Sequence, residues 1–147
     1  MGDGPERGRL EELITDSHLE SCVQITWFLS GAALQRELQG VGTVVIPTIM
    51  EETAGLAALE QMAHGRTLMV SDVGGLSEAV EGAGITFPPG DSSALAEAMR
   101  RIMNESGLAS SLAVLARRRV VQSFSPSAMI DAHAGVYREL YRGSLEQ

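Results

Sequence analysis

The sequence contains no lysine, because all 11 of its basic residues are arginine. A catalytic or phosphate-binding step that needs a lysine would therefore depend on another chain. Cysteine is almost absent as well. The single Cys22 excludes an internal disulfide and a cysteine-rich zinc site, which fits a reducing compartment. We expect Cys22 to be a small buried side chain.

Long apolar runs and an excess of positive charge are also missing. No stretch approaches the roughly 20 apolar residues that a membrane-spanning helix needs, and the first residues match neither a signal peptide nor a targeting helix. The formal net charge of -8 disfavours an extended basic surface for nucleic acid or anionic lipid. We expect a cytoplasmic protein without a transmembrane segment, and peripheral attachment to a membrane is left open.

What the sequence does contain is an alternation of short β-branched runs and longer helical patterns, which is typical of a parallel sheet flanked by helices. With 147 residues, 44% of them hydrophobic, the chain is expected to form one α/β domain with its own core. Each predicted strand is short and apolar, and is expected to be buried on both faces. The four predicted strands are Cys22 to Trp27, Thr43 to Ile46, Thr67 to Ser71 and Gly84 to Phe87.

Seven helices are predicted around these strands. Asp91 is the expected N-cap of the fifth helix, and Ser125 with Pro126 is expected to open the last one. Apolar residues in the last helix recur at helical spacing, which predicts that one of its sides packs on another element. The first six ranges are Arg7 to Thr15, Ala32 to Leu38, Gly55 to His64, Leu76 to Val80, Asp91 to Glu105 and Gly107 to Ser123.

The segment after Pro47 combines a strand end, a loop, two glutamates and a helix start. In a parallel sheet such a junction lies at the carboxyl edge, where ligands bind. The free amides of the helix start favour an anion such as a diphosphate, and Gly55 would let ligand atoms approach closely. Glu52 and Glu60 lie about two helical turns apart, so both can face one ligand and accept hydrogen bonds from adjacent sugar hydroxyls. Glutamates are also common on solvated helix faces, which is the alternative for this pair.

The other polar motifs are weaker. His18, His64 and His133 lack the spacing of metal ligands, so we expect neither a metal site nor a cofactor, and His64 is expected at a helix end. Residues 72–78, DVGGLSE, look like a phosphate loop or like an ordinary tight turn between a strand and a helix. The consecutive arginines 117–119 point around a helix rather than along one side, which predicts a solvated surface.

Taken in order, these motifs resemble the C-terminal, nucleotide-sugar-binding domain of family 4 glycosyltransferases of the GT-B type. The resemblance covers nearly the whole chain and depends on the order and spacing of the motifs. They are GDGP at 2–5, Pro47, the Glu-x7-Glu pair of Glu52 and Glu60 with Gly55 and Leu56 between them, Gly65, DVGGLSE at 72–78, and Gly90-Asp91 before an amphipathic helix.

The resemblance implies a Rossmann-like sheet and a retaining, metal-independent transfer of a hexose-like sugar from a nucleotide diphosphate sugar to a hydroxyl acceptor. It implies that Glu52 holds hydroxyls of the transferred sugar and that Glu60 holds the two ribose hydroxyls. No residue of this chain is assigned as catalytic. The implied donor-binding segment consists of Glu52, Thr53, Ala54, Gly55, Leu56 and Glu60. An N-terminal acceptor domain, or a partner chain, would supply the rest of the enzyme.

In that family two strands precede the GDGP segment and bring an arginine and a lysine to the diphosphate, whereas here only Met1 precedes it. The sequence therefore predicts a single partial domain over residues 1–147 that lacks the first two strands of its sheet and is inactive alone. Two alternatives are a non-catalytic nucleotide-sugar-binding subunit and an inactive gene fragment. Because the Cys22 to Trp27 strand would lose its neighbours, we also expect marginal stability or association through exposed edges.

Overall fold

The computed structural model describes residues 3–145, without the side chains of residues 144 and 145. The chain divides into two compact units, Met1–Val41 and Gly42–Gln147. Each unit is described by itself, and the single partial domain expected from the sequence stays a prediction. Gly2 of the GDGP segment lies outside the described residues.

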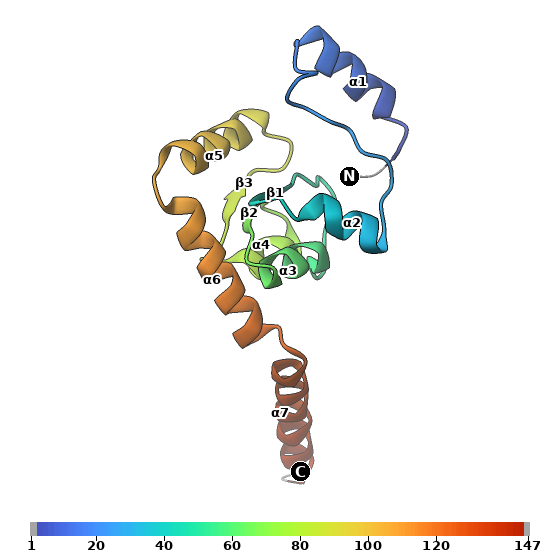
Figure 1. The fold of residues 1–147 in the computed structure, drawn as a ribbon. Helices are drawn as coiled ribbons and strands as arrows, with labels where there is room; N and C mark the ends of the chain where they lie inside the picture. Colours follow the sequence, from blue (N-terminus) through green and yellow to red (C-terminus); the bar gives the residue numbers. More distant parts are fainter. Residues whose placement is uncertain (1–2, 146–147) are drawn as a thin grey trace. The chain divides into compact units, whose positions relative to one another are not determined.

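The first unit contains two helices, α1 (Arg7–Asp16) and α2 (Gly31–Leu38), joined by an irregular segment (Figure 1). The prediction of a strand over Cys22 to Trp27 was wrong. The amides of Cys22 and Val23 instead both donate hydrogen bonds to the carbonyl of Leu19, which closes a turn directly after α1. The residues that follow have no neighbouring strand within this unit to pair with. Cys22 is exposed rather than buried, because it lies in this turn.

The second unit is built on a parallel sheet of three strands in the order β1 (Thr43–Ile46), β2 (Thr67–Ser71) and β3 (Ile85–Phe87). Thr43 lies opposite Thr67, and Met69 lies opposite Ile85. These positions confirm three of the predicted strands. Only β2 is fully buried, because β1 and β3 are the edges of the sheet, so the expectation of burial on both faces was wrong for the outer two.

Side chains that alternate along β2 divide the core into two layers. Leu68 and Val70 face one side, where they pack with buried residues of three helices, α3 (Leu56–Ala63), α4 (Gly74–Val80) and α6 (Leu108–Ser123). Met69 faces the other side, where it packs with Phe87 and with Ala98 of α5 (Ser92–Asn104). The sheet therefore has helices on both faces, as an α/β fold requires.

Local capping explains where several helices begin and end. Oδ1 of Asp91 accepts hydrogen bonds from the amides of Ser93 and Ala94 at 3.0 and 2.9 Å, which confirms it as the N-cap of α5. Oγ of Ser125 accepts one from the amide of Ala128 at 3.2 Å at the start of α7 (Pro126–Leu145). His64 is the C-cap of α3, as predicted.

Helix α7 differs from its prediction. The apolar residues expected to pack on another element, which include Met129, Val136, Tyr137, Leu140 and Tyr141, are each more than half exposed. Among the described residues of this unit, that side of the helix is therefore largely uncovered. In the part of the chain that the structure describes, no helix combines the length and the apolar character needed to cross a membrane.

Candidate functional site

The loops that follow β1 and β2 leave the sheet at the same edge, because the two strands are parallel. The first loop, residues 47–55, is mostly exposed and leads into α3. The second is a short turn at Asp72 and Val73 that leads into α4. Both helices therefore begin at this edge and direct their first amides and the positive ends of their dipoles toward it.

Glu52 lies in the first loop, with its carboxylate folded back onto the backbone of the same loop. Its Oε1 accepts hydrogen bonds from the amides of Gly55, at 3.3 Å, and of Ala54, at 3.5 Å. Both exceed the roughly 3.2 Å at which such bonds are usually found, so they hold the carboxylate weakly. Two of the amides that were expected to face a ligand thus face the Glu52 carboxylate.

Gly55 converts the loop into a helix. It has a φ of +59°, in the left-handed region, and α3 begins after it at Leu56, one residue later than predicted. A Cβ on Gly55 would lie 3.3 Å from both Cα and Cδ1 of Leu76 in α4. Glycine is therefore needed here for its backbone conformation and for packing between two helices. Thr53 and Leu56, the flanking residues of the predicted donor-binding segment, are exposed.

The turn before α4 packs its backbone directly against the Glu52 loop. The amide of Gly75 donates a 2.7 Å hydrogen bond to the carbonyl of Glu52. A Cβ on Gly74 would lie 2.6 Å from that carbonyl oxygen, and a Cβ on Gly75 would overlap the carbonyl group of Thr53. Only glycine fits at both positions without movement of the backbone. The DVGGLSE segment is thus a tight strand-to-helix turn that supports the neighbouring loop.

Glu60 lies on α3, and its side chain is exposed. Ala58 and Met62, two positions to either side of it, are completely buried, so Glu60 lies on the side of the helix away from the core. Neither Glu60 nor Glu52 lines either of the two cavities described below. That the two carboxylates face one ligand stays a prediction.

Two features near this edge were not predicted from the sequence. Ser71, the last residue of β2, is completely buried, and its hydroxyl has no hydrogen-bond partner among the described residues. A cavity of about 360 Å³ is lined by Asp72, Ser77, Glu78, Val80, Glu81, Gly82, Gly84 and Thr86. Its three carboxylates disfavour a diphosphate there.

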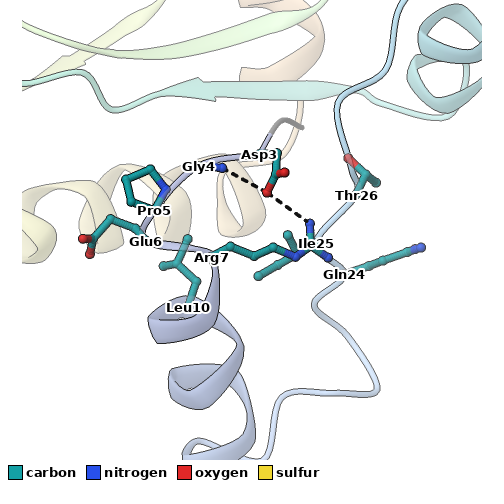
Figure 2. A pocket seen from close by; sticks show the side chains of 9 residues that line it. All are labelled: Asp3, Gly4, Pro5, Glu6, Arg7, Leu10, Gln24, Ile25 and Thr26. Atoms are coloured by element: carbon teal, nitrogen blue, oxygen red, sulfur yellow. Dashed lines mark hydrogen bonds and ion pairs between the residues drawn. The ribbon is translucent and has the colours of Figure 1, made fainter.

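The first unit has a larger cavity, of about 480 Å³, between the start of α1 and the segment that carries Ile25 and Thr26 (Figure 2). Nη1 of Arg7 and Oγ1 of Thr26 are buried at this cavity and form no hydrogen bond with a described residue. The Arg7 guanidinium lies 2.8 Å from Glu11 and 3.7 Å from the centre of the Trp27 ring. The complete lining is Asp3, Gly4, Pro5, Glu6, Arg7, Leu10, Gln24, Ile25 and Thr26. With two carboxylates and one guanidinium it carries a net negative charge, which does not favour a diphosphate.

The arginines of α6 hold the opposite ends of the two helices that begin at the candidate site. Nε and Nη2 of Arg119 donate hydrogen bonds to the carbonyls of Ala79 and Glu78 at 2.9 and 2.7 Å, at the end of α4. Nη1 of Arg117 donates one to the carbonyl of Ala63 at 2.6 Å, at the end of α3. The sequence predicted a solvated surface for this run, and Arg117 and Arg118 are exposed, whereas Arg119 is partly buried, so the prediction was wrong for Arg119. Cationic side chains satisfy the unpaired carbonyls of helix ends and oppose their negative dipoles.

No group of three or more His, Cys, Asp or Glu residues close enough to hold a metal ion occurs among residues 3–145. One titratable group outside the candidate site has a perturbed acidity. A side-chain hydrogen bond to Glu105, together with the charge of that carboxylate, raises the pKa of Arg101 on the surface of α5. Arg101 is charged at any physiological pH, so this pair contributes no pH dependence to the site.

The chain is similar to known proteins over most of its length. The model of the family described as glycosyl transferases group 1 matches residues 1–105. The alpha-D-kanosaminyltransferase of Streptomyces kanamyceticus is 35% identical over 141 residues, which cover 95% of this chain and 36% of that protein. Among solved structures, the sucrose-phosphate synthase of Thermosynechococcus elongatus superposes with a TM-score of 0.76 at 32% identity, over 95% of this chain and 35% of that one. An Anabaena protein solved in complex with UDP gives a TM-score of 0.74 at 25% identity, over 94% and 39%.

These similarities define an α/β chain with the fold of the GT-B glycosyltransferases. The chain belongs to the group 1 glycosyl transferases. It spans about a third of the length of the relatives that it matches.

Proposed function

We propose that this chain is the donor-binding part of a glycosyltransferase that transfers a hexose-like sugar from a nucleotide diphosphate sugar to a hydroxyl acceptor, with retention and without a metal ion. The observation that carries the proposal is the corner after β1. A carboxylate, a glycine in the left-handed region and the free amides of α3 follow one another there, and a second carboxylate lies further along the same helix. The family and the UDP-bound Anabaena protein point to the same class of ligand.

Within this proposal, Glu52 accepts hydrogen bonds from hydroxyls of the transferred sugar and Glu60 accepts them from the two ribose hydroxyls. Charge-assisted bonds of this kind are roughly twice as strong as neutral ones. The amides of Ala54, Gly55 and Leu56 lie between the two and favour the diphosphate. Thr53 completes the segment. An incoming donor would replace the weak contacts that the Glu52 carboxylate makes with the amides of its own loop.

The chemical step needs more than these residues. As the donor breaks apart, negative charge grows on the departing diphosphate, and a nearby cation stabilises it. No lysine is available for this purpose in the chain. We propose that an N-terminal acceptor domain or a partner chain closes over the donor and brings the acceptor hydroxyl, and that the chain is inactive alone.

Calorimetry tests the donor-binding role. UDP-glucose, ADP-glucose and GDP-glucose are titrated into the wild-type chain and into Glu60→Ala and Glu52→Ala, with and without EDTA. We expect one donor to bind, each substitution to weaken it about tenfold or more, and EDTA to have no effect. Glu97→Ala is the control, since Glu97 is an exposed glutamate of α5 whose carboxylate pairs with its helix neighbour Arg100. Absence of binding for all donors, or equal binding by wild type and Glu60→Ala, would contradict the proposal.

A further inference from the structure

Two backbone segments interlock at the candidate site, and the contact leaves no room for side chains. Gly74 and Gly75 open α4, and the carbonyls of Glu52 and Thr53 lie directly against their Cα atoms. The 2.7 Å hydrogen bond from the amide of Gly75 to the carbonyl of Glu52 joins the two segments. Such a contact between a turn after one strand and a loop after its neighbour fixes their separation.

The same contact fixes the backbone from which the Glu52 carboxylate extends. The carbonyl of Glu52 accepts the hydrogen bond from Gly75, and its Oε1 makes a weaker 3.3 Å contact with the amide of Gly55. Gly55 is itself packed against Leu76, the residue that follows Gly75. Leu76 is 1% exposed and belongs to the main core, so this set of contacts is anchored in the core of the unit.

We propose that Gly75 is a positioning residue for Glu52, and that through Glu52 it determines how firmly the site holds the sugar of a nucleotide sugar. This inference rests on the proposed function. Gly75 itself touches no ligand in this arrangement. Because Gly75 has no side chain, the Glu52 loop can approach α4. The amide of Gly75 then holds the backbone carbonyl of Glu52, the residue that carries the carboxylate.

A substitution of Gly75 is expected to weaken contacts to the sugar more than contacts to the nucleotide. A methyl group at position 75 would push the Thr53 carbonyl away and move Glu52 with it, and displacements on the order of 1 Å can cost about a hundredfold in function. Glu60 lies on α3, further along the chain from the displaced segment. Contacts to the nucleotide should therefore persist while contacts to the sugar weaken.

The test measures the dissociation constants of UDP and UDP-glucose, and of the corresponding ADP and GDP pairs, for the same protein. The ratio of the dissociation constant of the nucleoside diphosphate to that of its sugar nucleotide reports the contribution of the sugar alone. We expect Gly75→Ala to lower this ratio about fivefold or more while the nucleotide itself binds within about twofold of wild type. Gly8→Ala is the matched control, because Gly8 is also the second residue of a helix without a positive φ, but a Cβ there would have nothing within 4 Å. It should leave the ratio unchanged.

A double-mutant cycle separates positioning from general damage. In a Glu52→Ala background the ratio is already reduced, and adding Gly75→Ala should reduce it no further. Thermal melts establish that each variant is folded. Should Gly75→Ala not fold, Ser77→Ala loosens the same turn gently by removing the 3.1 Å hydrogen bond from its hydroxyl to the Gly74 carbonyl, and should lower the ratio by a smaller factor.

Equal weakening of UDP and UDP-glucose by Gly75→Ala, or by Ser77→Ala where it is used instead, would overturn the inference and leave the proposed function intact. A further loss of the ratio in the Glu52→Ala background would do the same. If no nucleotide or nucleotide sugar binds to the wild-type chain, the proposed function fails, and the inference fails with it.

Discussion

The hydroxyl of Thr67 donates a 2.7 Å hydrogen bond to the carbonyl of Ala109, which lies 42 positions later in the sequence. The bond joins the start of the central strand to the first turn of α6, and Thr67 is 1% exposed. It therefore ties the sheet to the helix whose arginines hold the ends of α3 and α4.

Thr67→Val keeps the shape of this side chain but removes its hydrogen bond to the partly buried carbonyl of Ala109. We expect the free energy of unfolding to fall by about 1 to 1.5 kcal/mol, measured by urea denaturation. Thr86→Val, at an exposed position of β3, is the matched control and should change the stability by no more than about 0.5 kcal/mol. Equal effects of the two substitutions would show that the bond to Ala109 contributes nothing.

The arginines of α6 provide a second comparison. Arg119→Ala removes two hydrogen bonds at the end of α4, and we expect it to lower the free energy of unfolding by about 1 to 2 kcal/mol. Arg118→Ala changes an exposed neighbour on the same helix and should cost no more than about 0.5 kcal/mol. Denaturation of both variants under identical conditions makes the comparison. The capping role is refuted if the two curves coincide.

Association is expected to accompany folding of this chain. The outer strands β1 and β3 have only one neighbour each, and α7 exposes apolar residues along its length. Open strand edges and uncovered apolar surface both favour self-association. Sedimentation velocity over a wide range of concentrations should show larger species as concentration rises. A cooperative melt of a strictly monomeric chain at every concentration would contradict this expectation.

The sequence predicted the second unit better than the first, for a physical reason. Strands β1 and β2 have their own β-branched runs and pair with each other, so local composition and tertiary pairing agree. The run from Cys22 to Trp27 has a similar composition, but no strand lies beside it within its unit, and the chain forms a turn at Leu19 instead. A strand is stabilised by its neighbours, which a local pattern does not specify.

The sequence predicted the order of the candidate site residues along the chain, but it did not predict the contacts that hold their loop in place. The positions of Glu52 and Glu60 around a helix start followed from spacing alone. Why positions 74 and 75 require glycine could not be predicted, because the atoms that exclude a side chain belong to a loop more than one helix earlier in the chain. The capping role of Arg119 was missed for the same reason, since its acceptors lie 40 and 41 positions away.

Each strand of the sheet pairs with the strand that comes next in the sequence. During synthesis, β1, the glutamate loop, α3, β2 and the paired glycines therefore emerge as one uninterrupted stretch, and they can begin to assemble before α6 exists. The later helix then secures a corner that is already formed. Contacts between nearby segments form sooner than contacts between remote ones, so the corner that carries Glu52 would be the first part of this unit to take shape on the ribosome.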